Sequence, residues 1–266
     1  MSNLASASRL ALFGCLLGLL GGRAEANITG FGDGTGFTLN AIANGPPTIS
    51  NGVLTLTNGQ GSETRSTFDN TAQDVRAFTA QFTYQDVGGG GADGVSFVIQ
   101  NGAAGVNAGG VGGSSLGYGG LSRSVAVLLS IFAPTPGTGL GLNGSTGVST
   151  PPSSFGPTGT VALNGGDAIQ ISLGYDGTTL TETLRDLTTS QAFATAYAVN
   201  IPSFTGSNTA FVGFTGATGA GTSTQQISNF TFTNAAPGTV AEPASLALLG
   251  VGLVAVAASR RRRKGP

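Results

Sequence analysis

The sequence predicts an all-β fold in which two sheets pack face to face. Between residues 27 and 234, apolar and polar residues alternate with a period of two in most segments, which is typical of half-buried antiparallel strands. The segment 125–132 is instead continuously apolar, as expected for a strand covered on both faces. This part of the chain shows no convincing helical period. The 266 residues are enough for one large β-sandwich domain, flanked by two targeting segments.

Period-two alternation marks the candidate strands. In 78–85, the apolar side chains fall on one face and threonine and glutamine side chains on the other. The dipeptide Asp176-Gly177 separates two further strands, 169–175 and 179–186, and an Asp-Gly pair between strands is a strong hairpin signal. Alternation recurs at 193–199 and at 230–232. Two segments rich in small and turn-forming residues, 134–159 and 235–240, are candidate linkers.

Residues 1–26 are predicted to be a secretory signal peptide. Arg9 supplies the positive start, 10–20 is an apolar run, and the small-x-small site ending at Ala26 is suited to cleavage. A lipoprotein signal at Cys15 is the alternative, but only four apolar residues precede that cysteine. Cleavage after Ala26 would remove the only cysteine, so we expect an exported domain without disulfides.

The charge of the domain argues against nucleic acid as a partner. Most basic residues lie in the two targeting segments, which leaves four arginines against ten acidic residues in 27–234, a net charge of −6. Such a domain has no basic face with which to neutralise phosphates.

The glycine-rich stretch 88–120 is the candidate binding region. It places a short apolar strand, 95–100, between two glycine-dense loops, with the single acid Asp93 just before the strand. Glycine permits backbone conformations with positive φ and lets a polar ligand approach the main chain closely. A turn-forming role for the Asp93 carboxylate is the alternative.

Four segments in this order resemble the legume-type (L-type) lectins: ADGVSFVIQN (92–101), GGSSLGYGG (112–120), LGYDGTTLTETLRD (173–186) and AFVGFTGATGAGTSTQQISNFTFT (210–233). The resemblance covers most of residues 27–234 and implies a concanavalin A-like jelly-roll sandwich that binds sugars.

The resemblance also implies roles for single residues. Asp93 matches the aspartate that accepts hydrogen bonds from sugar hydroxyls and that usually follows a cis peptide bond. Gly113 or Ser114, depending on the loop register, would offer a backbone N–H. Phe132 matches an aromatic residue that stacks on the sugar, although burial in the core is the equal alternative. Ala220 and Gly221, which follow Ala217-Thr218-Gly219, match the loop that tunes which sugar fits.

The metal-binding residues of the lectins are not matched. In legume lectins, acids on the strand corresponding to 125–132 and just beyond it hold Ca²⁺ and a transition metal. Here the matching positions are Leu128, Ser130, Pro134 and approximately Gly137. These residues are poor ligands, since Ca²⁺ takes six or more oxygens, several of them charged. We therefore expect no metal cofactor.

The C-terminal segment, 241–266, combines Ala241-Glu242-Pro243, an apolar run at 244–258 and a basic cluster at 260–264. It resembles the PEP-CTERM sorting signal of Gram-negative bacteria, which an exosortase-type membrane enzyme is thought to process. Because Ala-Glu-Pro replaces Pro-Glu-Pro, the processing point near Glu242 and Pro243 is open. A plain membrane anchor is the alternative: the run is short for a bilayer, and its basic end should stay cytoplasmic with the β domain outside.

Catalysis is not expected. Without histidine or a mature cysteine, nucleophilic triads and histidine-based metal sites are excluded. A glycosidase needs two carboxylates about 5–10 Å apart. The domain has two glutamates, Glu63 and Glu182, and neither has an acid two residues away, while Asp186 falls where the strand of Glu182 turns. Two functions remain: an exported protein that binds a glycan or exopolysaccharide, and a non-binding structural component of the matrix or envelope.

Overall fold

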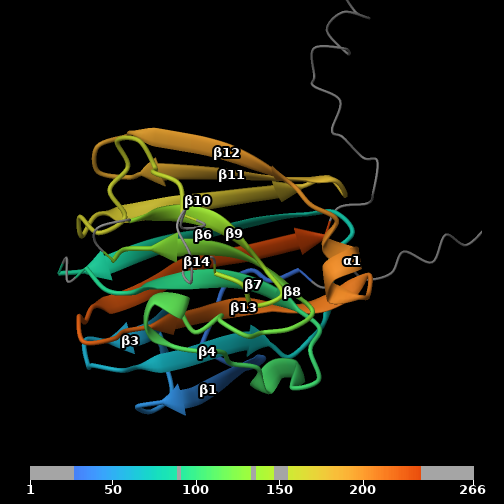
Figure 1. The fold of residues 1–266 in the computed structure, drawn as a ribbon, viewed down its shortest axis with the longest axis horizontal. Coiled ribbons are helices and arrows are strands. Elements are labelled where there is room, and N and C mark those ends of the chain that lie inside the picture. Colours follow the sequence, from blue (N-terminus) through green and yellow to red (C-terminus); the bar gives the residue numbers. More distant parts are fainter. Residues whose placement is uncertain (1–26, 89–90, 133–135, 147–154, 235–266) are drawn as a thin grey trace, which may run out of the picture.

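The protein folds as two seven-stranded antiparallel sheets packed face to face (Figure 1). The computed structural model describes residues 27–88, 91–132, 136–146 and 155–234. The first sheet, called the β7 sheet, has the order β1 (Phe37–Ala43), β4 (Thr64–Asp69), β13 (Thr209–Ala217), β7 (Gly94–Gln100), β8 (Ser124–Ser130) and β9 (Gly137–Leu142), with β5 (Gln73–Asp74) paired to β13. The second, the β6 sheet, has the order β12 (Ala192–Ala198), β11 (Thr179–Asp186), β10 (Ala168–Tyr175), β6 (Phe78–Val87), β14 (Thr224–Asn234), β3 (Val53–Asn58) and β2 (Thr48–Ser50).

Helical structure in the described residues is limited to short pieces. The helix α1 (Ile201–Thr205) lies at one end of the sandwich, and two 3₁₀ turns, η1 (Gly105–Asn107) and η2 (Gly113–Ser115), lie in the segment between β7 and β8 (Figure 1). The prediction of an all-β sandwich is confirmed.

The main core lies between the sheets and is dominated by phenylalanine. Phe97 and Phe214 project from the β7 sheet, and Phe82 and Phe230 project from the β6 sheet. Their rings meet edge to face, with centroids 5.0 Å apart for Phe82 and Phe214 and 4.9 Å apart for Phe214 and Phe230. The cluster joins the inner faces of the two sheets.

A second, smaller core explains why β8 is apolar throughout. Val127 and Leu129 of β8 belong to the main core between the sheets. Ala126 and Leu128 face the other way and pack under the segment 105–121, which crosses the outer face of the β7 sheet. The strand is buried on both faces, as its sequence predicts.

Most predicted strands correspond to observed ones, and the predicted hairpin is present. Segments 78–85 and 169–175 fall within β6 and β10, 179–186 is β11, and 193–199 overlaps β12. Between β10 and β11, Asp176 accepts hydrogen bonds from the amides of Thr178 and Thr179, and Gly177 has φ of +107°.

Two predictions need correction. The strand at 125–132 ends at Ser130, so that Phe132 lies beyond it. The candidate linker 134–159 contains the edge strand β9, which pairs with β8. Glycine in β9 reflects packing rather than flexibility, because a β-carbon on Gly141 would come within 2.5 Å of the Tyr118 ring.

The signal peptide (1–26), the linker 235–240 and the C-terminal segment 241–266 lie outside the described residues. Within the described ranges, no helix has the length and apolar character needed to cross a membrane.

Candidate functional site

Asp93 lies at one end of the β7 sheet, immediately before β7, with its main chain fixed by neighbouring strands. Its amide donates to the carbonyl of Ala217 at 3.1 Å, and its carbonyl accepts from the amide of Ile131 at 3.0 Å. The peptide bond between Ala92 and Asp93 is cis. The next residue, Gly94, has φ of +141°, and a β-carbon there would overlap the carbonyl oxygen of Leu129. Only glycine fits at this position.

One oxygen of the Asp93 carboxylate, Oδ2, is a buried acceptor without a donor among the described residues. The residue is 5% exposed, and Oδ2 has no hydrogen-bond partner among the described residues. Burial raises the pKa of this carboxyl above its usual 3.8. Buried polar atoms are nearly always paired in folded proteins, so an orphan such as Oδ2 calls for an explanation. The turn-forming alternative does not supply one, since no described amide donates to Oδ2.

Glycines leave space beside this oxygen. A β-carbon on Gly219 would lie 3.1 Å from Oδ2, and one on Gly113 would lie 3.8 Å from it. Gly113 begins the 3₁₀ turn η2, and the first amides of such a turn have no partner within it. Ser114 follows in the same turn and is exposed. The loops 109–121 and 218–223 therefore flank the carboxylate.

The remaining predicted residues lie around the site. Ala220 and Gly221 are exposed in the loop between β13 and β14, and a β-carbon on Gly221 would lie 2.8 Å from that of Ala92. Phe132 is 44% exposed and follows Ile131, whose amide is bonded to Asp93. The alternative that Phe132 belongs to the core is wrong, because its side chain is exposed.

Gly219 was not singled out from the sequence, although a β-carbon on it would lie 3.1 Å from Oδ2 of Asp93. The segment 58–65, which is hydrogen-bonded to this loop, carried no sequence signal either. The available clue for Gly219 was its position inside the small-residue run 216–221.

The two glutamates of the domain are completely buried and lie outside this site. Glu63 forms an ion pair with Arg65 at 2.5 Å. Glu182 accepts hydrogen bonds from Thr138 at 2.7 Å and Tyr197 at 2.9 Å. Neither glutamate presents a carboxylate to a substrate.

The residues at the lectin metal positions do not fit a metal pair. Leu128 is buried in the smaller core, Ser130 ends β8, and Gly137 begins β9. Pro134 lies outside the described residues. A neutral set of this kind lacks the charged oxygens that Ca²⁺ requires. In the described part of the chain, no three His, Cys, Asp or Glu residues come close enough to hold an ion.

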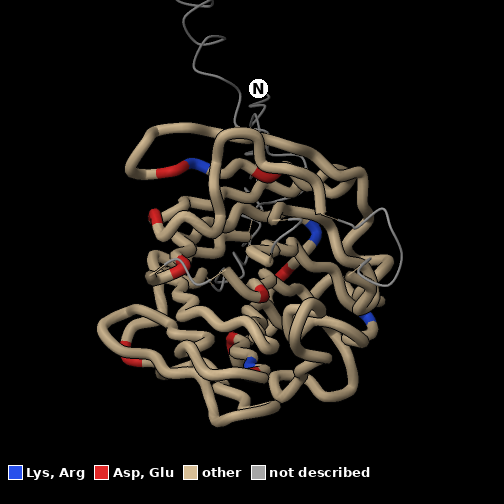
Figure 2. Tube along the Cα trace, turned by 60° about the vertical axis from the view of Figure 1, so that its left-hand side comes forward, with Lys and Arg blue, Asp and Glu red and all other residues tan. Residues whose placement is uncertain are grey.

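Charged residues are sparse, and the arginines lie apart from one another (Figure 2). Arg65 and Arg76 are paired with Glu63 and Asp74. Arg123 donates to the carbonyl of Thr205 at 3.0 Å. These three arginines are therefore tied individually into the structure.

Plant lectins are among the solved structures that share this fold. Basic winged bean lectin with Tn-antigen has a TM-score of 0.64 and 22% identity over 80% of this chain and 98% of that chain. The lectin from Bauhinia forficata in complex with GalNAc has a TM-score of 0.63 and 17% identity over 78% and 96%. Arcelin-5, a lectin-like defense protein from Phaseolus vulgaris, has a TM-score of 0.61 and 17% identity over 78% and 96%. At these identities the likeness establishes the fold. A comparison with curated protein sequences gave no significant match.

The sandwich, with an acid and glycine loops at one end of its β7 sheet, defines a protein of the lectin-like class. A model of the legume lectin domain matches residues 24–246, and the chain belongs to that family. The PEP-CTERM protein-sorting motif matches residues 239–263 and indicates export to the cell envelope.

Proposed function

We propose that this protein is an exported, non-catalytic lectin whose Asp93 binds a glycan. The observation that carries the proposal is the buried, unpartnered Oδ2 with open space at Gly113 and Gly219. A sugar hydroxyl is a donor of the right size to fill that space and satisfy the oxygen. Because a carboxylate only accepts, it favours neutral hydroxyl groups over anionic groups.

Other residues add to recognition. The amide of Gly113 or Ser114 donates to a second sugar oxygen, and the exposed ring of Phe132 stacks on the apolar face of the sugar. Ala220 and Gly221 form the rim that selects among sugars. The ligand is a cell-surface glycan or an exopolysaccharide.

Binding is independent of metal ions in this proposal, since the positions of Leu128 and Ser130 supply no charged ligand. The C-terminal segment holds the protein at the inner membrane until an exosortase-type enzyme processes it near Glu242 and Pro243. The domain is then surface-tethered or released.

The second candidate is a non-binding structural component of the matrix or envelope. Its support is the same replacement of acids by Leu128 and Ser130 on β8. Under this alternative, the arrangement of residues around Asp93 is kept by the fold but binds no ligand.

A glycan array distinguishes the two functions. We expect the wild-type protein to bind with Ca²⁺ and equally with a chelator. Asp93→Asn should weaken binding by about 10- to 100-fold, because hydrogen bonds to a charged acceptor contribute about 1.5–3 kcal/mol. Asp33→Asn, in an exposed loop, should bind like wild type. Affinity should fall as the pH drops through the raised pKa of Asp93, since a protonated carboxyl accepts poorly.

Each contrary result is informative. Loss of binding in chelator would show that a metal is needed after all. Folded protein that binds no glycan in either condition would support the structural alternative.

A further inference from the structure

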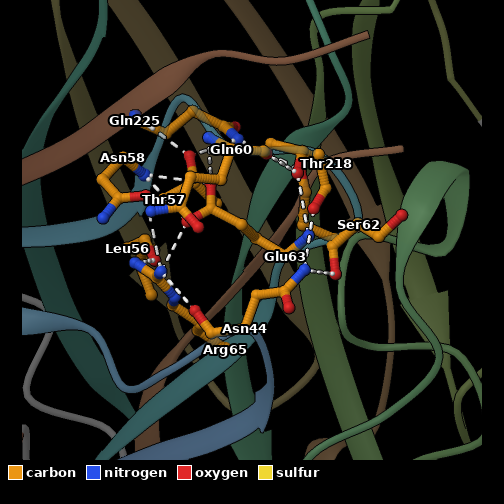
Figure 3. A network of polar contacts seen from close by, with 12 residues as sticks. Asn44, Leu56, Thr57, Asn58, Gln60, Ser62, Glu63, Arg65, Thr218 and Gln225 are labelled. Carbon is orange, nitrogen blue, oxygen red and sulfur yellow. Dashed lines mark hydrogen bonds and ion pairs between the residues drawn. The ribbon is translucent and has the colours of Figure 1, made fainter. Parts of the chain in front are cut away.

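The segment that joins β3 of the β6 sheet to β4 of the β7 sheet, residues 58–65 and here called the support segment, is held by a buried carboxylate. Glu63 is fully buried, and its Oε2 accepts from the amides of Asn58 at 3.0 Å and Gln60 at 3.2 Å. Its Oε1 lies 2.5 Å from Nη2 of Arg65. The carboxylate thus closes the turn on itself (Figure 3).

Arg65 ties the support segment to the rest of the molecule. Its guanidinium donates to the carbonyl of Leu56 at 3.3 Å and to the carbonyl of Asn44 at 2.7 Å. Asn44 in turn donates its side-chain amide to the carbonyl of Gly61 at 2.8 Å. Both charges of this ion pair are buried, so removing either partner would leave the other charge uncompensated and would be costly.

The support segment contacts the loop 218–223, which flanks Asp93 on one side. Thr218 and Glu63 exchange hydrogen bonds: the Glu63 amide donates to Oγ1 of Thr218 at 2.9 Å, and the Thr218 amide donates to the Glu63 carbonyl at 3.0 Å. Oγ1 of Thr218 also donates to the Gln60 carbonyl at 2.6 Å. The Ser62 amide donates to the carbonyl of Gly219, the glycine beside Oδ2 of Asp93, at 2.9 Å.

The support segment also contacts the loop 109–121, which flanks Asp93 on the other side. A β-carbon on Gly112 would overlap Oγ1 of Thr64, the residue that follows Glu63. Gly112 directly precedes Gly113, which borders Oδ2 of Asp93. The support segment therefore contacts both loops of the site.

We propose that the support segment positions the loops at Gly113 and Gly219 around the Asp93 carboxylate, and that Thr218 is its principal positioning residue. This inference rests on the proposed function, because it concerns the same site. Thr218 is 1% exposed and its hydroxyl is used by Glu63 and Gln60, so it acts on the ligand only through the loop.

Thr218→Val tests the proposal in the full-length protein, because it keeps the shape and removes the hydroxyl. We expect affinity for the array-selected glycan to fall by about tenfold or more, the effect of one well-placed hydrogen bond to the site. Thr218→Ser keeps the hydroxyl and should restore affinity to within about twofold of wild type.

The matched control is Thr205→Val. Thr205 is also fully buried and donates its hydroxyl to the carbonyl of Ser207 at 2.8 Å. It lies at the other end of β7, since its carbonyl accepts from Asn101, just beyond that strand. Seven strand residues separate the two ends by about 20 Å. This variant should lose stability without losing affinity.

A second readout does not require a sugar. The titration of the Asp93 carboxyl, followed by NMR in the free protein, should move toward its ordinary pKa in Thr218→Val, because a loosened Gly219 loop exposes the carboxylate. Wild-type affinity with an unchanged titration would overturn the proposal. If the wild type binds no glycan, the proposed function fails. The Asp93 titration alone then decides whether the support segment positions the loop.

A variant on the other loop guards against loss of folding in Thr218→Val. Gly112→Ala pushes the loop at Gly113 away from Thr64. It should weaken glycan binding, or shift the Asp93 titration where no glycan binds. If Gly112→Ala changes neither the affinity nor the Asp93 titration, the support segment has no role at that loop and the proposal is wrong.

Discussion

Glu182 is a carboxylic acid placed between the two sheets, and its environment favours the neutral form. It lies on β11 and reaches Thr138 on β9 of the opposite sheet. Burial raises its pKa from 4.5 to about 7, although hydrogen bonds from Thr138 and Tyr197 oppose the rise. Thr138 can also donate to the carbonyl of Leu128 at 3.1 Å. A protonated Glu182 can donate to Thr138 and free the threonine for that second bond.

The raised pKa makes stability depend on pH in a defined direction. Between pH 4.5 and about 7, the folded protein keeps the Glu182 proton that the unfolded chain has lost, so stability falls as the pH rises. The shift corresponds to roughly 3 kcal/mol. Glu182→Gln should remove most of this slope, measured as the free energy of unfolding in urea at pH 5 and pH 8.

Asp176→Asn is the control for that slope. The pKa of Asp176 lies below its usual 3.8, chiefly because the amide of Thr178 donates to it. Its stabilising effect is lost only in more acidic solution, so this variant should keep the wild-type slope between pH 5 and pH 8. An unchanged slope in Glu182→Gln would mean that Glu182 titrates normally.

At the scale of elements, β13 shows how closely the strands at the centre of the β7 sheet approach one another. It pairs with β4 on one side and β7 on the other. A β-carbon on Gly213 would overlap the carbonyl oxygen of Thr67 and lie 2.8 Å from the Phe68 Cα. Gly213→Ala should therefore lower the free energy of unfolding by about 1–3 kcal/mol, the usual cost of overpacking.

Gly165→Ala provides the comparison in the same urea titration. The nearest atom to an added β-carbon there is on Ala162, at an ordinary 3.5 Å. The variant should be close to wild type. Equal stabilities for the two alanine variants would contradict the packing described for β13.

At the scale of the molecule, the aromatic core joins segments that are far apart in sequence. Phe31, which precedes β1, contacts Phe214 of β13 and Phe230 of β14. The chain has one cysteine, Cys15, and so cannot form an internal disulfide. The core has to supply the stability that disulfides give many exported domains. Phe214→Ala should cost about 3–5 kcal/mol by calorimetry or urea unfolding.

Leu187→Ala is the matched surface change, because Leu187 is 47% exposed. Its effect should stay within about 0.5 kcal/mol. A reducing agent should change the melting temperature of none of these proteins. A loss from Phe214→Ala no larger than that from Leu187→Ala would mean that the aromatic cluster does not hold the sheets together.

The sequence alone determined the features that local patterns encode. Alternation identified β6, β10 and β11, Asp176-Gly177 identified a hairpin, and the apolar run at 125–132 identified β8 as a strand buried on both faces. The short motif around Asp93 also pointed to the acid of the proposed site. These features could be predicted because each depends on the period or turn preference of neighbouring residues.

The tertiary structure alone decided which distant residues meet. It exposed Phe132, placed Gly219 beside Asp93, and gave β9 a partner where composition suggested a linker. It also buried Glu182 and joined Thr218 to Glu63 across 155 positions of the chain. Such contacts follow from strand order and sheet packing, and no local pattern records which strand ends share one end of the sandwich.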